Sequence, residues 1–244
     1  MRLHHFYINE NIGDKKEIVV NSLELIHQIS KVFRLKSGNE VVIFDGSGSD
    51  YRCSVSYPSE VDQKVVILTT LEKVVSLFMP SREITLCSAL VKKDTFEWIV
   101  EKATELGVTR IIPVLAYRSE KKALNMERLN KIAIEASEQS GRGNVPMIGD
   151  IESLASAIGA LKVVIANAGT SMTSIVFHTE GGAFDKKIIP KNTPLTVFIG
   201  PEGGWSPAEI ELFHREKIPV ICLGLQVLRA ETAVVAALSM VVFG

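Results

Sequence analysis

Two glycine-containing segments near the end of the chain have the residue types that a small-molecule pocket needs. Residues 195–209 read LTVFIGPEGGWSPAE, and residues 221–237 read ICLGLQVLRAETAVVAA. In each segment an apolar, strand-like run ends at a glycine, and a loop then leads into the start of a helix. Neighbouring strand ends of an α/β sheet form the usual crevice for a ligand, and glycine there lets a ligand approach the backbone. The two segments therefore predict a ligand site built largely from main-chain groups.

The loop of the first segment leads into a marked helix start. Ser206, Pro207 and Glu209 have the spacing of a capping box with proline at the first helical position.

Dinucleotide and ATP binding are disfavoured, because the chain has neither a GxGxxG nor a GxxxxGK[ST] motif.

Strands and helices that must position these loops are expected to alternate from about residue 82 onward. The pattern predicts strands over residues 84–90, 110–115, 163–166, 195–199 and 219–223, and helices over residues 94–106 and 127–140. Each of the last two strands is followed by a helix. Such alternation predicts an α/β fold with a parallel sheet and helices on both faces.

The first seventy or so residues have a different, mainly β pattern. Strands are expected over residues 2–8, 40–44, 51–57 and 64–70, and a single helix over residues 22–35. One helix among several strands predicts a small barrel. Because Met79-Pro80-Ser81 interrupts both patterns, we place a linker near residues 77–82 and expect two domains, 1–74 and 75–244.

Composition limits the class of protein. The chain has 46% hydrophobic residues and a net charge of −1, and neither its first 73 residues nor the remainder is basic. An RNA-binding surface would therefore have to be a local patch. No apolar run approaches the roughly 18 residues of a membrane span, and the N-terminus lacks a signal-peptide core, so we expect a cytoplasmic protein.

The cysteines and histidines predict neither disulfides nor a metal site. Cys53, Cys87 and Cys222 are odd in number and far apart, which indicates buried free thiols in a reducing compartment. The five histidines also lack the spacing of metal ligands.

Five segments in order give the chain a specific family resemblance. They are FRLKSGNEVVIFDGSG (33–48), FEWIVEKATELGV (96–108), EASEQSGR (135–142), IGPEGG (199–204) and LRAETA (228–233). Together they resemble the SPOUT methyltransferases, and most closely the RsmE family, which methylates N3 of a uridine in 16S ribosomal RNA.

The resemblance implies a fold, a cofactor and a partner copy. It implies a SPOUT domain with a C-terminal trefoil knot, although knots are rare in general, and a PUA-like N-terminal barrel. It implies a homodimer that packs through knot helices including residues 234–243. The implied cofactor is S-adenosyl-L-methionine, and the residues expected to bind it are Ile199, Gly200, Pro201, Gly203, Gly204, Leu223, Gly224, Leu228, Thr232 and Ala233.

The implied reaction indicates the catalytic candidates. N3 of uridine carries a weakly acidic proton, so a base must lie within hydrogen-bond reach, and the charge that develops on O2 and O4 needs a cation or N–H donors. The planar guanidinium of Arg229 could stabilise the charge on O2 and O4. Alternatively, Arg229 pairs with Glu231 and braces the loop. Glu202 and Glu231 are the nearest carboxylates in the sequence.

Six basic residues are candidates for contacts with 16S rRNA or the small ribosomal subunit. Two lie at the end of the first predicted helix, and we expect four to form a local patch on the second domain: Arg34 and Lys36, then Arg118, Lys121, Lys122 and Arg142. The chain departs from the family at Gln226 and Ala230, where a basic residue and threonine are common. It also departs at His5-Phe6-Tyr7, where Arg-Phe-Phe is common.

Two other functions fit the pattern. The first is a SPOUT methyltransferase for another position, such as a tRNA ribose 2′-OH, although the N-terminal barrel favours the rRNA family. The second is a non-catalytic RNA-binding assembly protein on the same scaffold.

Overall fold

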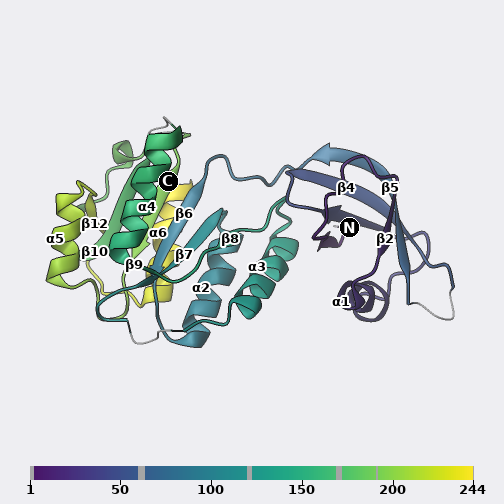
Figure 1. Cartoon of the computed structure of the whole chain (residues 1–244), viewed down its shortest axis with the longest axis horizontal. Coiled ribbons are helices and arrows are strands. Elements are labelled where there is room, and N and C mark those ends of the chain that lie inside the picture. The colour runs from purple at the N-terminus through teal and green to yellow at the C-terminus, as the bar shows by residue number, and fades with distance from the viewer. Residues whose placement is uncertain (1–2, 60–63, 120–122, 169–171, 191, 244) are drawn as a thin grey trace. The chain divides into compact units, whose positions relative to one another are not determined.

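The computed structural model describes residues 3–59, 64–119, 123–168, 172–190 and 192–243. These residues form two compact units (Figure 1). Residues 1–79 and 137–145 make up the first, and residues 80–136 and 146–244 make up the second. Contacts thus divide the chain after Met79, within the expected linker, and assign the end of one helix to the first unit.

The first unit is built on a curled five-stranded sheet in the order β1-β3-β4-β5-β2. The strands are β1 (His5–Tyr7), β2 (Glu17–Val20), β3 (Glu40–Phe44), β4 (Ser49–Ser56) and β5 (Val66–Val75). The β1–β3 pair is parallel and the other three pairs are antiparallel. Helix α1 (Leu23–His27) continues into a π-helical turn, η1 (Gln28–Val32), and together they form residues 23–32 of the helix predicted over residues 22–35.

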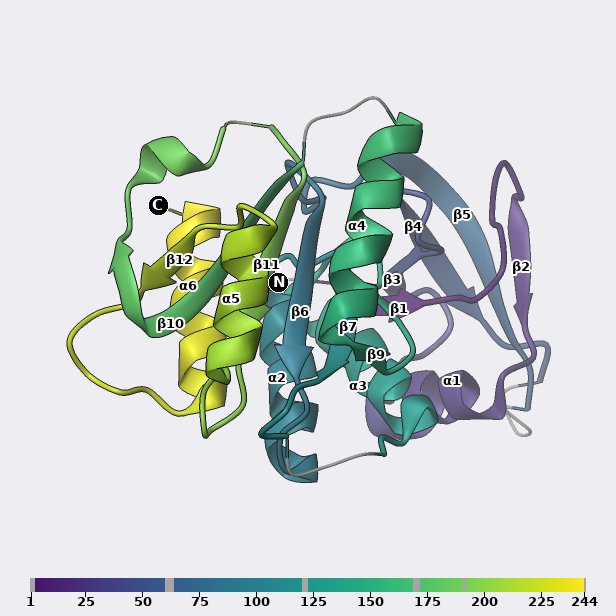
Figure 2. The same cartoon turned by 60° about the vertical axis from the view of Figure 1, so that its left-hand side comes forward.

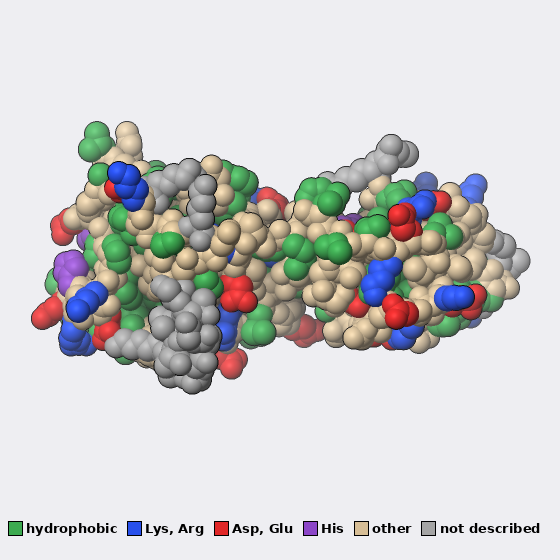
Figure 3. Space-filling model, turned by 90° about the horizontal axis from the view of Figure 1, so that it is seen from above, with side chains coloured by type: hydrophobic (Ala, Val, Ile, Leu, Met, Phe, Trp, Pro, Cys, Tyr) green, Lys and Arg blue, Asp and Glu red, His purple; other side chains and the backbone are tan. Residues whose placement is uncertain are grey.

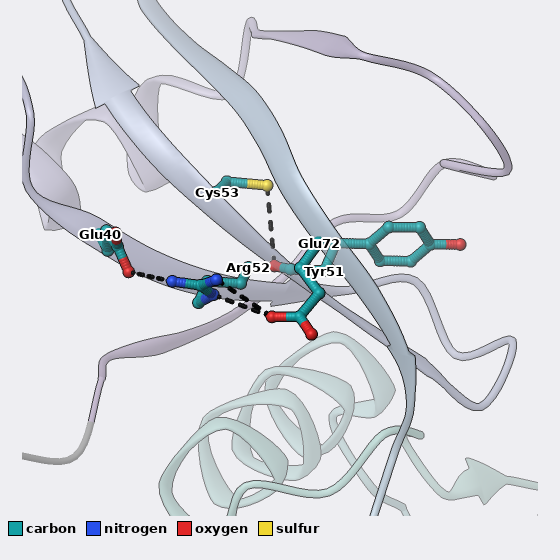
Figure 4. A network of polar contacts seen from close by, with 5 residues as sticks. All are labelled: Glu40, Tyr51, Arg52, Cys53 and Glu72. Carbon is teal, nitrogen blue, oxygen red and sulfur yellow. Dashed lines mark hydrogen bonds and ion pairs between the residues drawn. The ribbon is translucent and has the colours of Figure 1, made fainter.

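An ion-pair network links the three central strands of this sheet (Figure 4). The Arg52 guanidinium on β4 donates to Glu40 on β3 at 3.0 Å and to Glu72 on β5 at 3.1 Å. These groups are exposed, so each ion pair adds little to stability. On the opposite side of β4, Cys53 is fully buried, and burial raises the pKa of its thiol to about 11.

The second unit contains a parallel sheet in the order β12-β10-β11-β6-β7-β8, with β9 also paired to β7. The strands are β6 (Ile84–Ala89), β7 (Arg110–Leu115), β8 (Met147–Ile148), β9 (Glu152–Ser153), β10 (Thr173–Ala183), β11 (Leu195–Ile199) and β12 (Val220–Cys222). All of their pairings are parallel. The α/β class predicted for this part of the chain is therefore confirmed.

Helices cover both faces of this sheet (Figure 2). They are α2 (Lys93–Glu105), α3 (Met126–Ser140), α4 (Leu154–Ala168), α5 (Pro207–Arg215) and α6 (Ala230–Phe243), with a short 3-10 turn, η2 (Lys186–Ile188). Apolar residues of α4 and α5 share one core with β6, β7, β10 and β11. Helices α2 and α6 pack against each other, and α6 also contacts β11.

One predicted strand is wrong, and four strands, β2, β8, β9 and β10, were not predicted. Residues 163–166 belong to helix α4, because a four-residue apolar run is equally compatible with a buried helix. The strand between β9 and β11 is instead β10, which lies between β11 and β12 in the sheet. Its apolar part is short, and a polar segment with two glycines follows it.

Candidate functional site

A pocket of about 320 Å³ lies at the carboxyl ends of β11 and β12 and beside the middle of β10. Such a volume is within the roughly 300–1,000 Å³ that small-molecule sites occupy. The lining includes nine of the ten predicted cofactor residues and one predicted catalytic residue: Ile199, Gly200, Pro201, Gly203, Gly204, Leu223, Gly224, Leu228, Ala233 and Glu202. The two glycine-containing segments thus meet at one site, and Thr232 is the cofactor candidate outside the lining.

Helix α5 begins directly beside this pocket, with the predicted capping box. The Ser206 hydroxyl accepts from the Glu209 N–H, the Glu209 carboxylate accepts from the Ser206 N–H, and Pro207 is the first helical residue. The other oxygen of Glu209 accepts from the Tyr117 N–H at 2.9 Å. One carboxylate therefore holds both the loop after β11 and the loop after β7.

Replacing Glu209 with alanine should lower the free energy of unfolding by about 1–2 kcal/mol, because a helix cap and a loop hydrogen bond are lost together. Urea denaturation would measure the change. Glu211→Ala, an exposed position on the same helix, is the matched control and should change stability by less than about 0.5 kcal/mol. Equal stability of the two variants would contradict the bracing role of Glu209.

The indole of Trp205 forms part of the pocket wall. Trp205 is 2% exposed, its Nε1 has no hydrogen-bond partner among the described residues, and its ring packs edge-on against Phe213 at 5.2 Å between centroids. A Cβ at Gly200 would lie only 3.1 Å from Nε1, so glycine is needed there for this packing. A buried N–H without a partner is costly.

Arg118 was predicted to bind RNA, yet the structure places it in the pocket wall. Its Nη1 donates to the Gly203 carbonyl oxygen at 2.6 Å, and its aliphatic carbons lie 3.2–3.8 Å from where a Cβ of Gly203 would be. Arg118 and Gly203 are 85 residues apart in the chain. No local sequence pattern identifies such a contact.

A third wall comes from β10 and was not predicted from the sequence. Phe177, His178, Thr179 and Glu180 line the pocket, at an interruption of the β10–β12 ladder where Phe177 and Gly182 both pair with Ile221. The extra residues form a bulge whose His178 Nδ1 accepts from the Glu180 N–H at 3.2 Å. The pair Gly181-Gly182 after an apolar run was the one local signal for it.

The other catalytic candidates lie outside the pocket lining. Arg229 is exposed and Glu231 is half-buried at the start of α6. Among the described residues, the Arg229 guanidinium has no ion-pair partner, so the alternative of a brace against Glu231 is not observed. Catalytic roles for Arg229, Glu202 and Glu231 remain predictions.

The described RNA-binding candidates are divided between the two units. Arg34 and Lys36 are exposed on the first unit, with Arg34 in the left-handed region at φ 52°, while Lys121 and Lys122 lie outside the described residues. Arg142 groups with the first unit, is 3% exposed and contacts Asn144. Burial lowers the pKa of its guanidinium to about 10. The expectation of an exposed Arg142 in a patch on the second domain is therefore wrong.

The face drawn in Figure 3 shows Lys and Arg side chains of the first unit interspersed with Asp and Glu side chains. On that face, the described residues present no continuous basic surface. RNA-binding roles for Arg34, Lys36 and Arg118 stay predictions.

The cysteines follow the predicted pattern except at the pocket. Cys53 and Cys87 are buried free thiols, whereas Cys222 is half-buried and lines the pocket, so the expectation that it is buried is wrong. Within the described ranges, no cluster of three His, Cys, Asp or Glu side chains could hold a metal ion. No helix among those residues is long and apolar enough to cross a membrane.

Comparison with known proteins identifies the family. A model described as an RNA methyltransferase domain matches residues 79–242. "Ribosomal RNA small subunit methyltransferase E" of Bacillus subtilis is 32% identical over 228 residues, which cover 88% of this chain and 86% of that protein. The chain belongs to this family of RNA methyltransferases. The resemblance of the five ordered segments is thereby confirmed.

Other similar proteins extend the match to nearly the whole chain. The methyltransferase E of Rickettsia conorii is 28% identical over 247 residues, 99% of this chain and 96% of that protein. The crystal structure of methyltransferase E from Neisseria gonorrhoeae, bound to S-adenosylmethionine, has a TM-score of 0.85 at 24% identity and covers 98% of this chain and 96% of that one. A methyltransferase of Legionella pneumophila, also bound to S-adenosylmethionine, has a TM-score of 0.81 at 24% identity and covers 99% and 97%. The methyltransferase fold therefore includes both units.

Proposed function

We propose that this protein methylates N3 of a specific uridine in 16S rRNA of the small ribosomal subunit, with S-adenosylmethionine as methyl donor. The observation that carries the proposal is the pocket at the ends of β11 and β12, formed largely by the two glycine-containing segments in a chain of the methyltransferase E family. The position N3 follows from the family resemblance.

The residues of the pocket fit S-adenosylmethionine. Glycines at 200, 203, 204 and 224 leave the backbone accessible, and Gly204 has a positive φ of 69°. Ile199, Leu223 and Leu228 supply apolar surface for an adenine ring. The charged Arg118 and Glu180 supply polar partners. The pocket therefore combines the contacts that a zwitterionic nucleoside requires.

The chain's own groups must orient the uridine and handle its proton. S-adenosylmethionine supplies an electrophilic methyl group on a sulfonium. Glu202 is the one carboxylate among the predicted catalytic residues that lines the pocket, so we favour it as the group that accepts the N3 proton, directly or through one water. Arg229, exposed beside the pocket residue Leu228, would stabilise the charge that develops on O2 and O4.

The finer features of the fold are part of the same proposal. We infer that the segments around β11, β12 and α6 form the trefoil knot of the SPOUT methyltransferases, and that the curled sheet of the first unit is a PUA-like barrel. Domain limits of 1–74 and 75–244 stay close to the observed division after Met79. The proposed location is the cytoplasm, where ribosomes are assembled.

We expect the protein to be a homodimer in solution. Helix α6 buries Val234, Ala237, Leu238 and Val241 within its own chain, while Val235, Ala236, Met240 and Val242 stay half-buried. A second apolar stripe of this kind is suited to a two-fold contact. Sedimentation should give about twice the chain mass of 26.8 kDa at micromolar concentration, and a monomer would contradict the proposal.

Nucleoside analysis decides the proposed function. Small-subunit rRNA from a strain that lacks the gene should lack N3-methyluridine at one site, and the purified protein should restore it with labelled S-adenosylmethionine. Restored label on a ribose 2′-OH, or on tRNA, would favour another methyltransferase specificity. Binding of rRNA without transfer of label would favour the non-catalytic assembly protein.

A further inference from the structure

The bulge in β10 presents a histidine to the pocket in a fixed position. Between Phe177 and Gly182, both paired with Ile221, the intervening residues leave the ladder. A Cβ on Gly181 would lie 2.4 Å from the backbone carbon of Ile221, so the bulge presses directly on the main chain of β12. Glycine at 181 therefore lets the bulge that carries His178 and Glu180 lie directly against the main chain of β12.

The hydrogen bond to Nδ1 determines what His178 offers to a ligand. Nδ1 accepts from the Glu180 N–H at 3.2 Å, so the neutral imidazole carries its proton on Nε2. Nε2 lies 3.7 Å from the position of a Cβ on Gly204, and it has no hydrogen-bond partner among the residues that the structure describes. His178 is therefore an N–H donor directed at the turn after β11.

Arg118 approaches the same turn and brings further donors. Its Nη1 is used by the Gly203 carbonyl oxygen, at 2.6 Å. The structure gives the remaining guanidinium N–H groups no hydrogen-bond or ion-pair partner among the described residues. Arg118 and His178 thus lie at the adjacent glycines 203 and 204, and both retain N–H donors.

We propose that Arg118 and His178 form a subsite for the carboxylate of the methionine moiety of S-adenosylmethionine. The inference rests on the proposed function and adds the residues that hold the amino-acid end of the methyl donor. The subsite offers N–H donors from a guanidinium and an imidazole, which match an anionic acceptor, and the carboxylate is the anionic group of this ligand. Glu180, which also lines the pocket, suits the adjacent ammonium.

Calorimetry with two nucleosides tests the subsite without turnover. S-adenosylhomocysteine contains the amino-acid end, and 5′-methylthioadenosine keeps the adenine and ribose but lacks it. His178→Ala should weaken S-adenosylhomocysteine binding by about 10–100-fold, the range for a lost hydrogen bond to a charged group. Binding of 5′-methylthioadenosine should change by less than about twofold, which also shows that the pocket is folded.

Two further variants sharpen the result. His178→Gln retains an N–H donor and should keep most of the affinity for S-adenosylhomocysteine. His214→Ala, an exposed position on α5 outside the pocket lining, is the matched control and should bind both nucleosides as the unaltered protein does.

The outcomes separate the subsite from the proposed function. Equal losses for both nucleosides in His178→Ala, or no loss for either, would overturn the subsite alone, since equal losses place His178 at the ribose or in the fold. If the unaltered protein bound neither nucleoside, the proposed function would fail and the subsite with it.

Discussion

Replacing Arg229 with alanine should lower the single-turnover rate of methyl transfer by about 10²–10³-fold, the typical effect of removing one oxyanion-type donor. Cofactor affinity should stay nearly unchanged, because Arg229 is outside the lining of the pocket. Arg229→Lys should restore only part of the rate, since a point charge cannot replace the planar guanidinium. Rapid-quench measurements with labelled S-adenosylmethionine and rRNA would give the rates.

The alternative role of Arg229, as a brace for the loop, predicts different results for these variants. If the guanidinium only braced the loop against Glu231, Arg229→Ala would lose cofactor affinity and thermal stability together, and Glu231→Gln would behave alike. The exposed Arg229 without an ion-pair partner among the described residues argues against this role. A near-normal single-turnover rate for Arg229→Ala would remove the residue from the mechanism.

Valine at Gly203 or Gly224 should weaken binding of S-adenosylmethionine by about 100-fold while the protein stays folded. A Cβ at Gly203 would lie 3.2 Å from Cδ of Arg118 and would displace that side chain from the pocket wall. Gly224 has φ +155°, a backbone conformation that valine rarely adopts. Overpacking and strain of this size cost about 1–3 kcal/mol each. Titration calorimetry would measure the affinity.

A glycine outside the pocket provides the control for these variants. Gly149 lies between β8 and β9, and a Cβ there meets its nearest neighbour at an ordinary 3.7 Å. Gly149→Val should bind S-adenosylmethionine as the unaltered protein does. Unchanged binding in both Gly203→Val and Gly224→Val would remove the two loops from the cofactor site.

Local signals were sufficient for the elements that carry the two predicted loops. The capping box at Ser206 and Glu209 was predicted correctly, because its two residues are three positions apart and form hydrogen bonds with each other. Strands β11 and β12 were also predicted, since each is a short apolar run that ends near a glycine. A short apolar run is compatible with both a strand and a buried helix, and for this reason the strand predicted over residues 163–166, within α4, is wrong.

The sequence by itself determined which loops form the pocket, because glycine spacing, helix capping and strand alternation are properties of adjacent residues. Only the tertiary structure decided what faces those loops. Parallel strands bring their carboxyl ends to one edge of the sheet, and this places Arg118 after β7 and His178 in β10 beside Gly203 and Gly204. Packing likewise decided that Arg142 is buried, since charge in a sequence does not reveal whether a side chain reaches solvent.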